Sequence, residues 1–318
     1  PGLILGAFLI CYGFAAVGDG VVGVPWADLA GSSLDERWRA RFLGLMSGIS
    51  GLVMLAIAPL IGTILSDAGP EFPNNYATLF GIAGVLFVLS IIPILFLIEL
   101  PGGKAVDKTP SFREFLPELG HVLRTDTPFR AMIITRMLTS LFAMAGPFYI
   151  GFATGTLNLS SEVAVPNLFA MQTIGSIIGA AVYTWLGAKN NLLYIRMALA
   201  GASILPISAL LSGVVGPFPL YIGFLVAGIT ISNLFFSYIN WIVTYASADK
   251  RPIYAGLFNT IAAVISLIAP LIGGTIAQHI GYEALFVVAI VMVYSALFVT
   301  LRYIPNVSKE KVELAPAD

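Results

Sequence analysis

The sequence predicts an all-α membrane protein with nine transmembrane helices. Three observations support this fold class: the composition, the recurrence of long apolar runs and the placement of the basic residues. Of the 318 residues, 58% are hydrophobic and only 10% are charged, whereas an ordinary soluble domain is about 25% charged. The 16 basic and 17 acidic side chains are too few to cover the surface of a soluble protein of this size. The composition therefore excludes a soluble globular enzyme.

The apolar runs define the predicted helices. A helix needs roughly 20 apolar residues to cross about 30 Å of hydrocarbon. Runs of about this length, bounded by charges, prolines, glycines or polar clusters, predict spans at 2–25, 42–66, 76–99, 131–153, 163–187, 192–212, 219–245, 253–279 and 283–304. The long polar connection, residues 101–130, has apolar residues at helical spacing, which predicts an amphipathic helix on the membrane surface.

The basic residues predict the orientation of the spans. Fifteen of the 16 Lys and Arg residues lie in the segments that follow the odd-numbered spans, and the alternate connections contain none. Because Lys and Arg in short loops stay on the cytoplasmic side, the N-terminus should lie outside and the C-terminus in the cytoplasm. We expect an integral, multi-pass protein of the plasma membrane, which in a bacterium is the inner membrane.

An internal repeat predicts two related bundles. Ala58-Pro-Leu-Ile-Gly in the second span recurs as Ala269-Pro-Leu-Ile-Gly in the eighth, and each copy follows a basic connection and a Gly-Leu pair. Copies six spans apart share one membrane orientation, as in parallel bundles related by an axis along the membrane normal. A six-span unit predicts three further helices before residue 1, in keeping with a sequence that begins at Pro1 without a methionine.

On these residues the sequence resembles the major facilitator superfamily of secondary transporters. The shared features are the topology, the linker, the Gly-Leu helix starts after Arg41 and Arg251, and the two Pro-Leu-Ile-Gly words. The resemblance implies helices four to twelve of a fold with two six-helix bundles. Its parts would be the last three helices of the N-terminal bundle (1–100), a cytoplasmic linker (101–130), the C-terminal bundle (131–305) and a cytoplasmic tail (306–318).

The resemblance also implies a function. A member of this family moves a small solute across the membrane by alternating access, and we expect coupling to protons or Na⁺. Residues 58–63, Ala-Pro-Leu-Ile-Gly-Thr, are similar to the family's Gly-Pro-x-x-Gly-Gly antiporter motif but carry Ala and Thr in place of two glycines. A drug/proton antiporter is therefore an alternative. We expect the 318-residue chain not to transport alone, because cavity-facing polar groups would meet lipid.

Competing classes lack their usual signatures. A membrane-embedded enzyme needs clustered catalytic residues, yet neither His-Glu-x-x-His nor Gly-x-Ser-x-Gly occurs. A channel is disfavoured because no repeated filter-like loop or ring-forming charge set is visible. The net charge of −1 leaves no basic excess for nucleic acid. We expect the lipid bilayer and a small-molecule solute as partners, and no cofactor, metal or obligate protein partner.

The seventh span carries the clearest candidates for solute contact. Its polar residues recur on one helical stripe, formed by Thr230, Asn233, Ser237, Asn240, Trp241 and Thr244. Polar groups in hydrocarbon usually face a bundle interior or a wet cavity. The alternative is hydrogen bonding between helices, at about 1 kcal/mol or less per bond. Gln172 and Asn259 are further cavity candidates, whereas Gly175 and Gly179 beside Gln172 favour close helix packing.

Two charged residues within predicted spans are candidates for function. Asp19 is a candidate coupling site for a proton or cation, because a partly desolvated carboxylate has a raised pKa; a structural ion pair or cap with the following Arg connection is the alternative. Arg136 could attract an anionic substrate, pair with Asp19, or extend to the lipid headgroups.

Candidates for conformational change lie at helix ends and at prolines. Pro59 and Pro270 each free a backbone carbonyl and could permit bending, or could fix a packing kink. Basic residues at related helix ends could form ion pairs that break and re-form between the bundles, or could act only as topology signals; these are Arg37, Arg39, Arg41, Lys250 and Arg251.

Overall fold

The structure is a computed structural model that describes residues 36–66, 68–96, 122–187, 189–246 and 251–306, together with a few isolated positions before residue 36 and residue 120. Every regular element in these ranges is a helix, as the sequence predicts. The predicted span at 2–25 and most of the connection at 101–130 lie outside the described residues.

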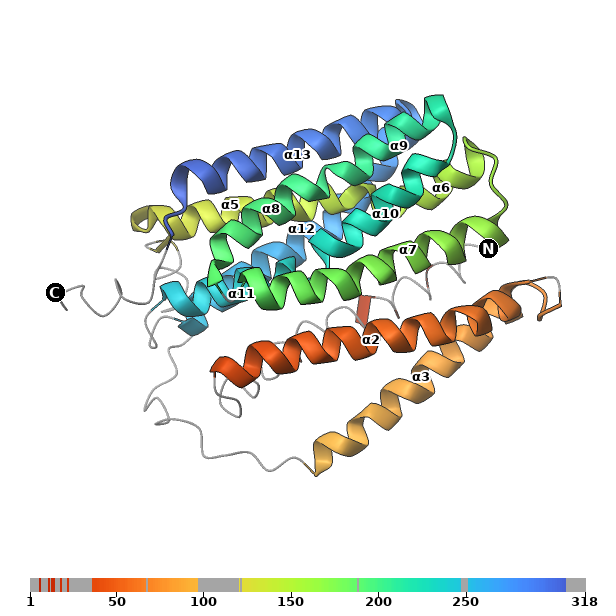
Figure 1. Ribbon diagram of the computed structural model, residues 1–318, viewed down its shortest axis with the longest axis horizontal. Coiled ribbons are helices and arrows are strands. Elements are labelled where there is room, and N and C mark those ends of the chain that lie inside the picture. The colour runs from red at the N-terminus through yellow and green to blue at the C-terminus, as the bar shows by residue number, and fades with distance from the viewer. Residues whose placement is uncertain are drawn as a thin grey trace.

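The helices run roughly side by side along the long axis of the molecule (Figure 1). Within the described part, eight segments are long and apolar enough to cross a membrane, and they correspond one by one to the second to ninth predicted spans. Their helices are α2 (Glu36–Leu65), α3 (Asn74–Leu95), α5 (Thr127–Phe142) with α6 (Phe148–Gly155), α7 (Ser161–Val182), α8 (Asn191–Ala202) with α9 (Ile204–Val215), α10 (Phe218–Ile231) with α11 (Leu234–Tyr245), α12 (Arg251–His279) and α13 (Tyr282–Tyr303). The chain is therefore an all-α membrane protein.

Three spans predicted as single helices are interrupted. The fourth passes through a 3-10 turn, η1 (Ala143–Ala145), before Pro147, and the sixth breaks at Ser203, three residues before Pro206. Proline explains both breaks, because it has no backbone N–H to donate to the carbonyl four residues earlier. The seventh breaks at Asn233 without a proline, at φ −106° and ψ 5°. A short polar side chain that favours local non-helical conformations accounts for this break in part.

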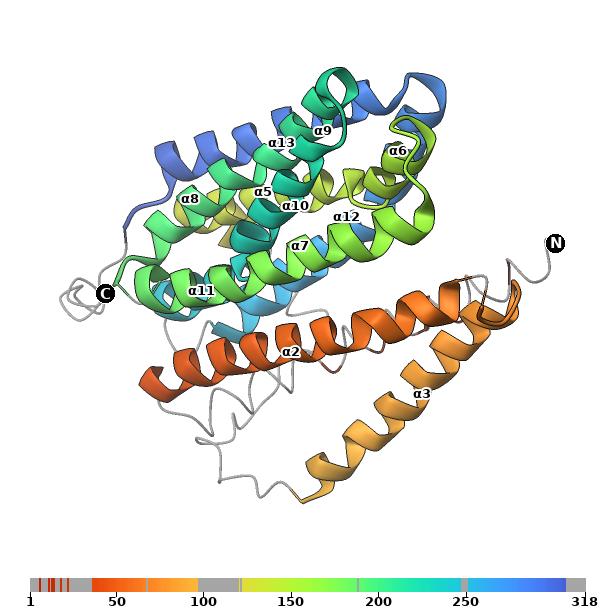
Figure 2. The same ribbon diagram turned by 45° about the vertical axis from the view of Figure 1, so that its right-hand side comes forward.

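The helices α5 to α13 form one bundle, and α2 and α3 lie along one side of it (Figure 2). The bundle contains the aromatic core, in which the Tyr149 and Phe286 rings stack at 4.8 Å between centroids. Helix α2 packs against α7, whereas α3 contacts α2 and has no buried residue. Apolar side chains remain exposed along α3 and α12, as expected for helices whose solvent is lipid.

Glycines bring α7 and α10 into close contact. A Cβ atom on Gly175 would overlap the carbonyl oxygen of Leu225, and one on Gly179 would overlap that of Ile229. The predicted role of Gly175 and Gly179 in close packing is confirmed.

The two copies of the internal repeat form similar long helices. Helix α2 has 30 residues and α12 has 29, and each contains its repeat proline, Pro59 or Pro270, in its interior. The hydroxyl of Thr63, which stands at the last position of the antiporter-like word, donates to the Pro59 carbonyl at 2.9 Å. Whether these prolines permit bending stays a prediction.

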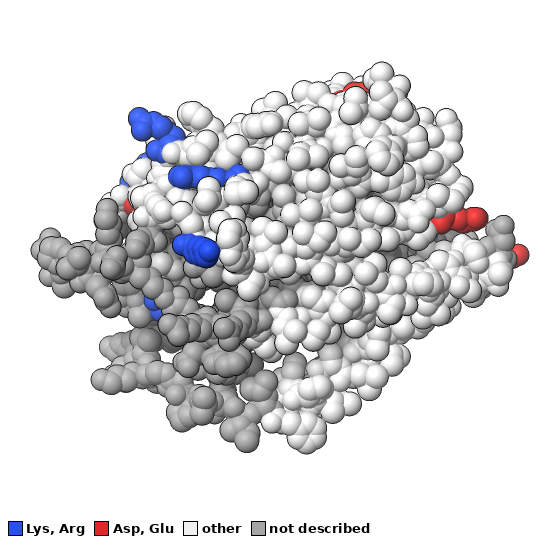
Figure 3. All heavy atoms as spheres, viewed as in Figure 1, with Lys and Arg blue, Asp and Glu red and all other residues white. Residues whose placement is uncertain are grey.

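Charges separate along the molecule. The visible basic side chains gather at one end of the helices, and most of the visible acidic ones lie at the other (Figure 3). This is the distribution from which the sequence predicted the orientation of the spans.

Candidate functional site

Arg136 lies in α5 with its guanidinium among three aromatic rings. Its Cζ atom is 5.7 Å from the ring centroid of Phe235, 5.9 Å from that of Tyr238 and 5.4 Å from that of Phe258. The first two rings belong to α11 and the third to α12. The faces of such rings attract cations, so α11 and α12 hold the arginine by its charge as well as by its apolar stem. We call Arg136 and these three rings the arginine cluster.

The guanidinium of Arg136 has no acidic partner and no hydrogen-bond acceptor in the described part of the chain. Its Nε atom is buried without a hydrogen bond. The terminal nitrogens of Arg136 also make no hydrogen bond to a described residue, but they are not fully buried. Arg136 is half-buried, and removing a charge from water without a partner is costly, which makes this arginine an unusual feature of the described bundle.

The arginine cluster has a closed side and an open side. Tyr238 and Phe258 are both 0% exposed, whereas Phe235 is 42% exposed. The Tyr238 hydroxyl lies beside the Thr139 side chain without making a hydrogen bond, and the Ser140 hydroxyl is buried and also unbonded. Two of the helices that form the arginine cluster, α5 and α11, therefore each carry a buried hydroxyl without a hydrogen bond.

The polar stripe of the seventh span is divided between two environments. Asn233, Ser237 and Trp241 are buried. The Asn191 side chain, from the start of α8, donates to the backbone carbonyl of Ser237 at 2.8 Å, and the Trp241 ring stacks on Tyr245 of the same helix at 4.5 Å between centroids. The hydrogen bond at Ser237 joins α11 to α8, as the alternative of bonding between helices expects. Asn233 Nδ2 and Trp241 Nε1 are buried without a partner, so their contact with a solute stays a prediction.

Three other candidates are more accessible. Asn240, Gln172 and Asn259 are partly exposed, and no hydrogen bond of their side chains to a described residue is present. They come from α11, α7 and α12 respectively. Asn259 directly follows Phe258 of the arginine cluster in the chain.

Comparison with known proteins finds a family match in the C-terminal part of the chain. A family model described as Major Facilitator Superfamily matches residues 168–318, from the middle of α7 to the end of the chain. Over these residues, slightly less than half of the chain, the protein is similar to the major facilitator superfamily. Its members are membrane transporters, so the protein is an integral, multi-pass transporter whose partners are the lipid bilayer and a small solute. No curated protein matches the chain.

The charged candidates of this transporter lie only partly within the described residues. Asp19 and Lys250 lie outside the described residues. Arg37, Arg39 and Arg41 belong to the first turns of α2, but their side chains also lie outside that part. Among the described residues, Arg251 makes no ion pair; its Nε donates to the Ala246 carbonyl at 3.2 Å, at the end of α11. The proposed ion pairs between bundles therefore stay a prediction.

Sequence reasoning missed Asp126, which joins three helices of the transporter. Its Oδ1 atom accepts hydrogen bonds from the Phe129 N–H at 2.9 Å and the Tyr245 hydroxyl at 2.7 Å, and its Oδ2 atom accepts one from the Tyr254 hydroxyl at 2.6 Å. Asp126 thus caps the start of α5 and binds the end of α11 and the start of α12. The sequence Asp-Thr-Pro at 126–128 could have indicated this role, since Asp before a proline in the first turn is typical of a helix start.

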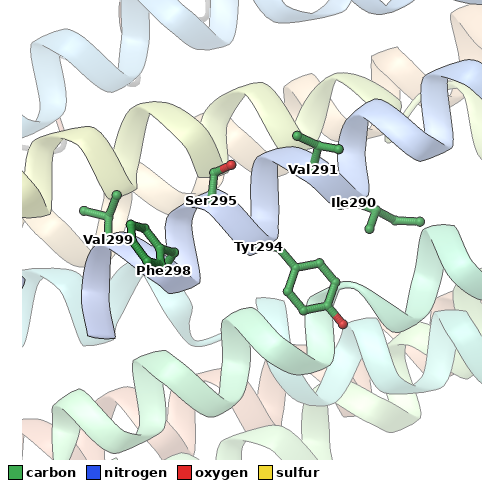
Figure 4. Close-up of a pocket in the computed structure, with 6 residues that line it drawn as sticks. All are labelled: Ile290, Val291, Tyr294, Ser295, Phe298 and Val299. Atoms are coloured by element: carbon green, nitrogen blue, oxygen red, sulfur yellow. The ribbon is translucent and has the colours of Figure 1, made fainter. Parts of the chain in front are cut away.

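A groove along α13 contrasts with the arginine cluster. It is lined by side chains of that one helix, with Tyr294 and Ser295 as its polar members (Figure 4); the residues are Ile290, Val291, Tyr294, Ser295, Phe298 and Val299. It holds no charged group. Such a surface suits a lipid chain better than a polar solute. Within the described part, no group of three metal-ligating side chains occurs.

Proposed function

We propose that the protein is a secondary active transporter that moves a small solute by alternating access. The observation that carries this proposal is the internal repeat, whose copies form the related helices α2 and α12 in a chain similar to the superfamily. Parallel repeats of this kind place the solute between two bundles that rock about it. The division into residues 1–100, 101–130, 131–305 and 306–318 belongs to the same proposal.

A ligand-stabilisation screen with the full-length protein comes first, because a solute that binds the native state raises its melting temperature. Flux of a hit into proteoliposomes then tests the mechanism. Saturable uptake that follows an imposed proton or Na⁺ gradient is expected. Unsaturable flux at channel rates would contradict the proposal, and chemical conversion of the solute would indicate an enzyme.

We propose Asp19 as the coupling residue, because a carboxylate within a span can bind and release a proton or hold a cation. Asp19→Asn in the full-length protein is expected to abolish uptake driven by a pH gradient while solute exchange at equal pH persists. Glu71→Gln, a carboxylate in the connection between α2 and α3, is the matched control. Unchanged pH-driven uptake by the Asp19→Asn variant would exclude this role.

The drug/proton antiporter remains the second candidate, favoured by the antiporter-like word at 58–63. This mechanism predicts that the solute leaves the cell as protons enter it. A pH-sensitive dye inside proteoliposomes distinguishes the two directions, because symport acidifies the compartment that gains the solute and antiport makes it more alkaline.

The basic end of the molecule is proposed to face the cytoplasm, with the protein in the plasma membrane. A protease-cleavable tag after Asp318 should be cut in inside-out vesicles and protected in intact cells. The reverse protection pattern would overturn the orientation.

A further inference from the structure

We propose that the solute is an organic anion with an aromatic or apolar body, whose acidic group binds Arg136. This inference rests on the proposed transport function and names the substrate class of the same site. The acidic group would pair with the guanidinium, and the apolar body would lie against Phe235, the exposed ring of the arginine cluster.

The first argument is an unmatched positive charge. Arg196, which also lies within a span, donates to the carbonyls of Thr300 at 2.7 Å and Ile304 at 3.1 Å. Arg136 has no such acceptor among the described residues, and its Nε atom is buried and unbonded. Aromatic faces offset the cost of a buried charge only in part. A bound anion would supply the acceptors that the described residues leave out.

The second argument is the break between α10 and α11. Helix α11 begins at Leu234, and Asn233 before it makes no capping hydrogen bond from its side chain. The first amides of a helix have no acceptors within the helix and carry a partial positive charge. Phe235 and Tyr238, from the first two turns of α11, are the rings that contact Arg136. The amino end of α11 therefore favours an anion on the same helix that supplies two of the rings around the guanidinium.

The acidic residues of the described part lie away from this place. Glu71, Glu162 and Glu283 lie at or beyond helix ends. Asp126 is bound by Tyr245 and Tyr254 and precedes Arg136 by ten residues, which is about 15 Å along a helix. No described carboxylate is thus placed to neutralise Arg136 or to accept an ammonium group. The described part of the site therefore favours an anionic group over a cationic one.

The shape of the site favours a carboxylate on an apolar body. A guanidinium binds a carboxylate through two parallel hydrogen bonds, and the terminal nitrogens of Arg136 are the accessible ones. Phe235 offers an apolar surface to the rest of the solute, whereas a sugar would gain little from it.

The test measures binding to the full-length protein with three matched probes. Benzoate is the anion, benzamide its neutral counterpart and benzylamine its cationic counterpart. We expect benzoate to raise the melting temperature, and benzamide and benzylamine to leave it unchanged. Arg136→Gln should weaken benzoate binding about 10- to 100-fold, the range that charged hydrogen bonds give. Arg302→Gln, an exposed arginine in the last turn of α13 is the control and should bind benzoate as the wild type does.

Two further variants keep the test independent of folding defects. Arg136→Lys retains the charge but loses the planar pair of donors, so it should fold and still bind benzoate more weakly than the wild type. Phe235→Ala should weaken the binding of benzoate more than that of acetate. Benzoate affinities within twofold of the wild type in both Arg136 variants, or stabilisation by benzylamine instead of benzoate, would overturn the proposal.

A lipid headgroup could supply the same anionic chemistry. The measurement is therefore repeated in vesicles of phosphatidylcholine alone and of phosphatidylcholine with phosphatidylglycerol. Stabilisation by phosphatidylglycerol that requires Arg136 and is not displaced by benzoate would assign the site to lipid and overturn the solute. Gradient-driven flux of a neutral solute by Arg136→Gln would refute this inference but leave the transport function intact. Benzoate binding that depends on Arg136 but is accompanied by no flux would support this inference and contradict the transport function.

Discussion

Gly175→Ala is expected to lower the melting temperature of the transporter by roughly 4–8 °C, equivalent to about 2 kcal/mol. The new Cβ atom would overlap the carbonyl oxygen of Leu225 on α10. A backbone oxygen cannot rotate away as a side chain can, so the two helices must separate. Gly228→Ala tests the same contact from the other side, because its Cβ atom would overlap the carbonyl oxygen of Gln172 on α7.

The matched control is Gly256→Ala in α12. A Cβ atom at this position would meet no atom within 4 Å, and alanine in a helix interior is favoured over glycine by roughly 0.5–1 kcal/mol. The control variant should therefore melt at the same temperature as the wild type or slightly higher. The melting temperatures of the three purified glycine variants are measured by thermal unfolding in the same detergent. Equal melting temperatures for Gly175→Ala and Gly256→Ala would show that α7 and α10 are not in close contact.

The fold could be predicted from the sequence because the bilayer limits its solutions. Hydrocarbon thickness sets the length of each apolar run, and the charge rule sets which ends share a side. The eight spans in the described part follow from these two constraints. The interruption at Asn233 could not be predicted in this way, since hydropathy averages over a span and gives no signal for one non-helical residue.

The candidate site could be predicted only in part. The position of Arg136 within an apolar run marked it as a functional candidate, but its aromatic neighbours belong to helices far along the chain. Periodicity identified the polar face of α11. It could not tell whether that face meets a cavity or a neighbouring helix, and Ser237 in fact packs against Asn191 at the start of α8. Such contacts depend on packing between helices, which a single sequence does not state.

Asp126→Ala is expected to have an even larger effect on stability, about 2–5 kcal/mol. The variant loses a helix cap and two hydrogen bonds from tyrosine hydroxyls to a charged acceptor. Those bonds join the start of α5 to the end of α11 and the start of α12. The Phe129 and Tyr254 rings also pack together, with 4.0 Å between their centroids. Thermal unfolding measures the effect, and Asp126→Asn should be milder because its side-chain oxygen can still cap α5.

The same three helices carry the arginine cluster, with Arg136 on α5, Phe235 on α11 and Phe258 on α12. Asp126 therefore acts as a positioning residue for that cluster. Tyr245→Phe and Tyr254→Phe each remove one hydroxyl from the carboxylate without changing a ring. If the three residues act as a unit, adding both tyrosine changes to Asp126→Ala should cost little further stability. Additive losses would show that the tyrosines act independently of Asp126.

Weaker benzoate binding by the Tyr245→Phe/Tyr254→Phe double variant, with Arg136 intact, would connect this junction to the solute site. A purely structural junction would change the melting temperature alone.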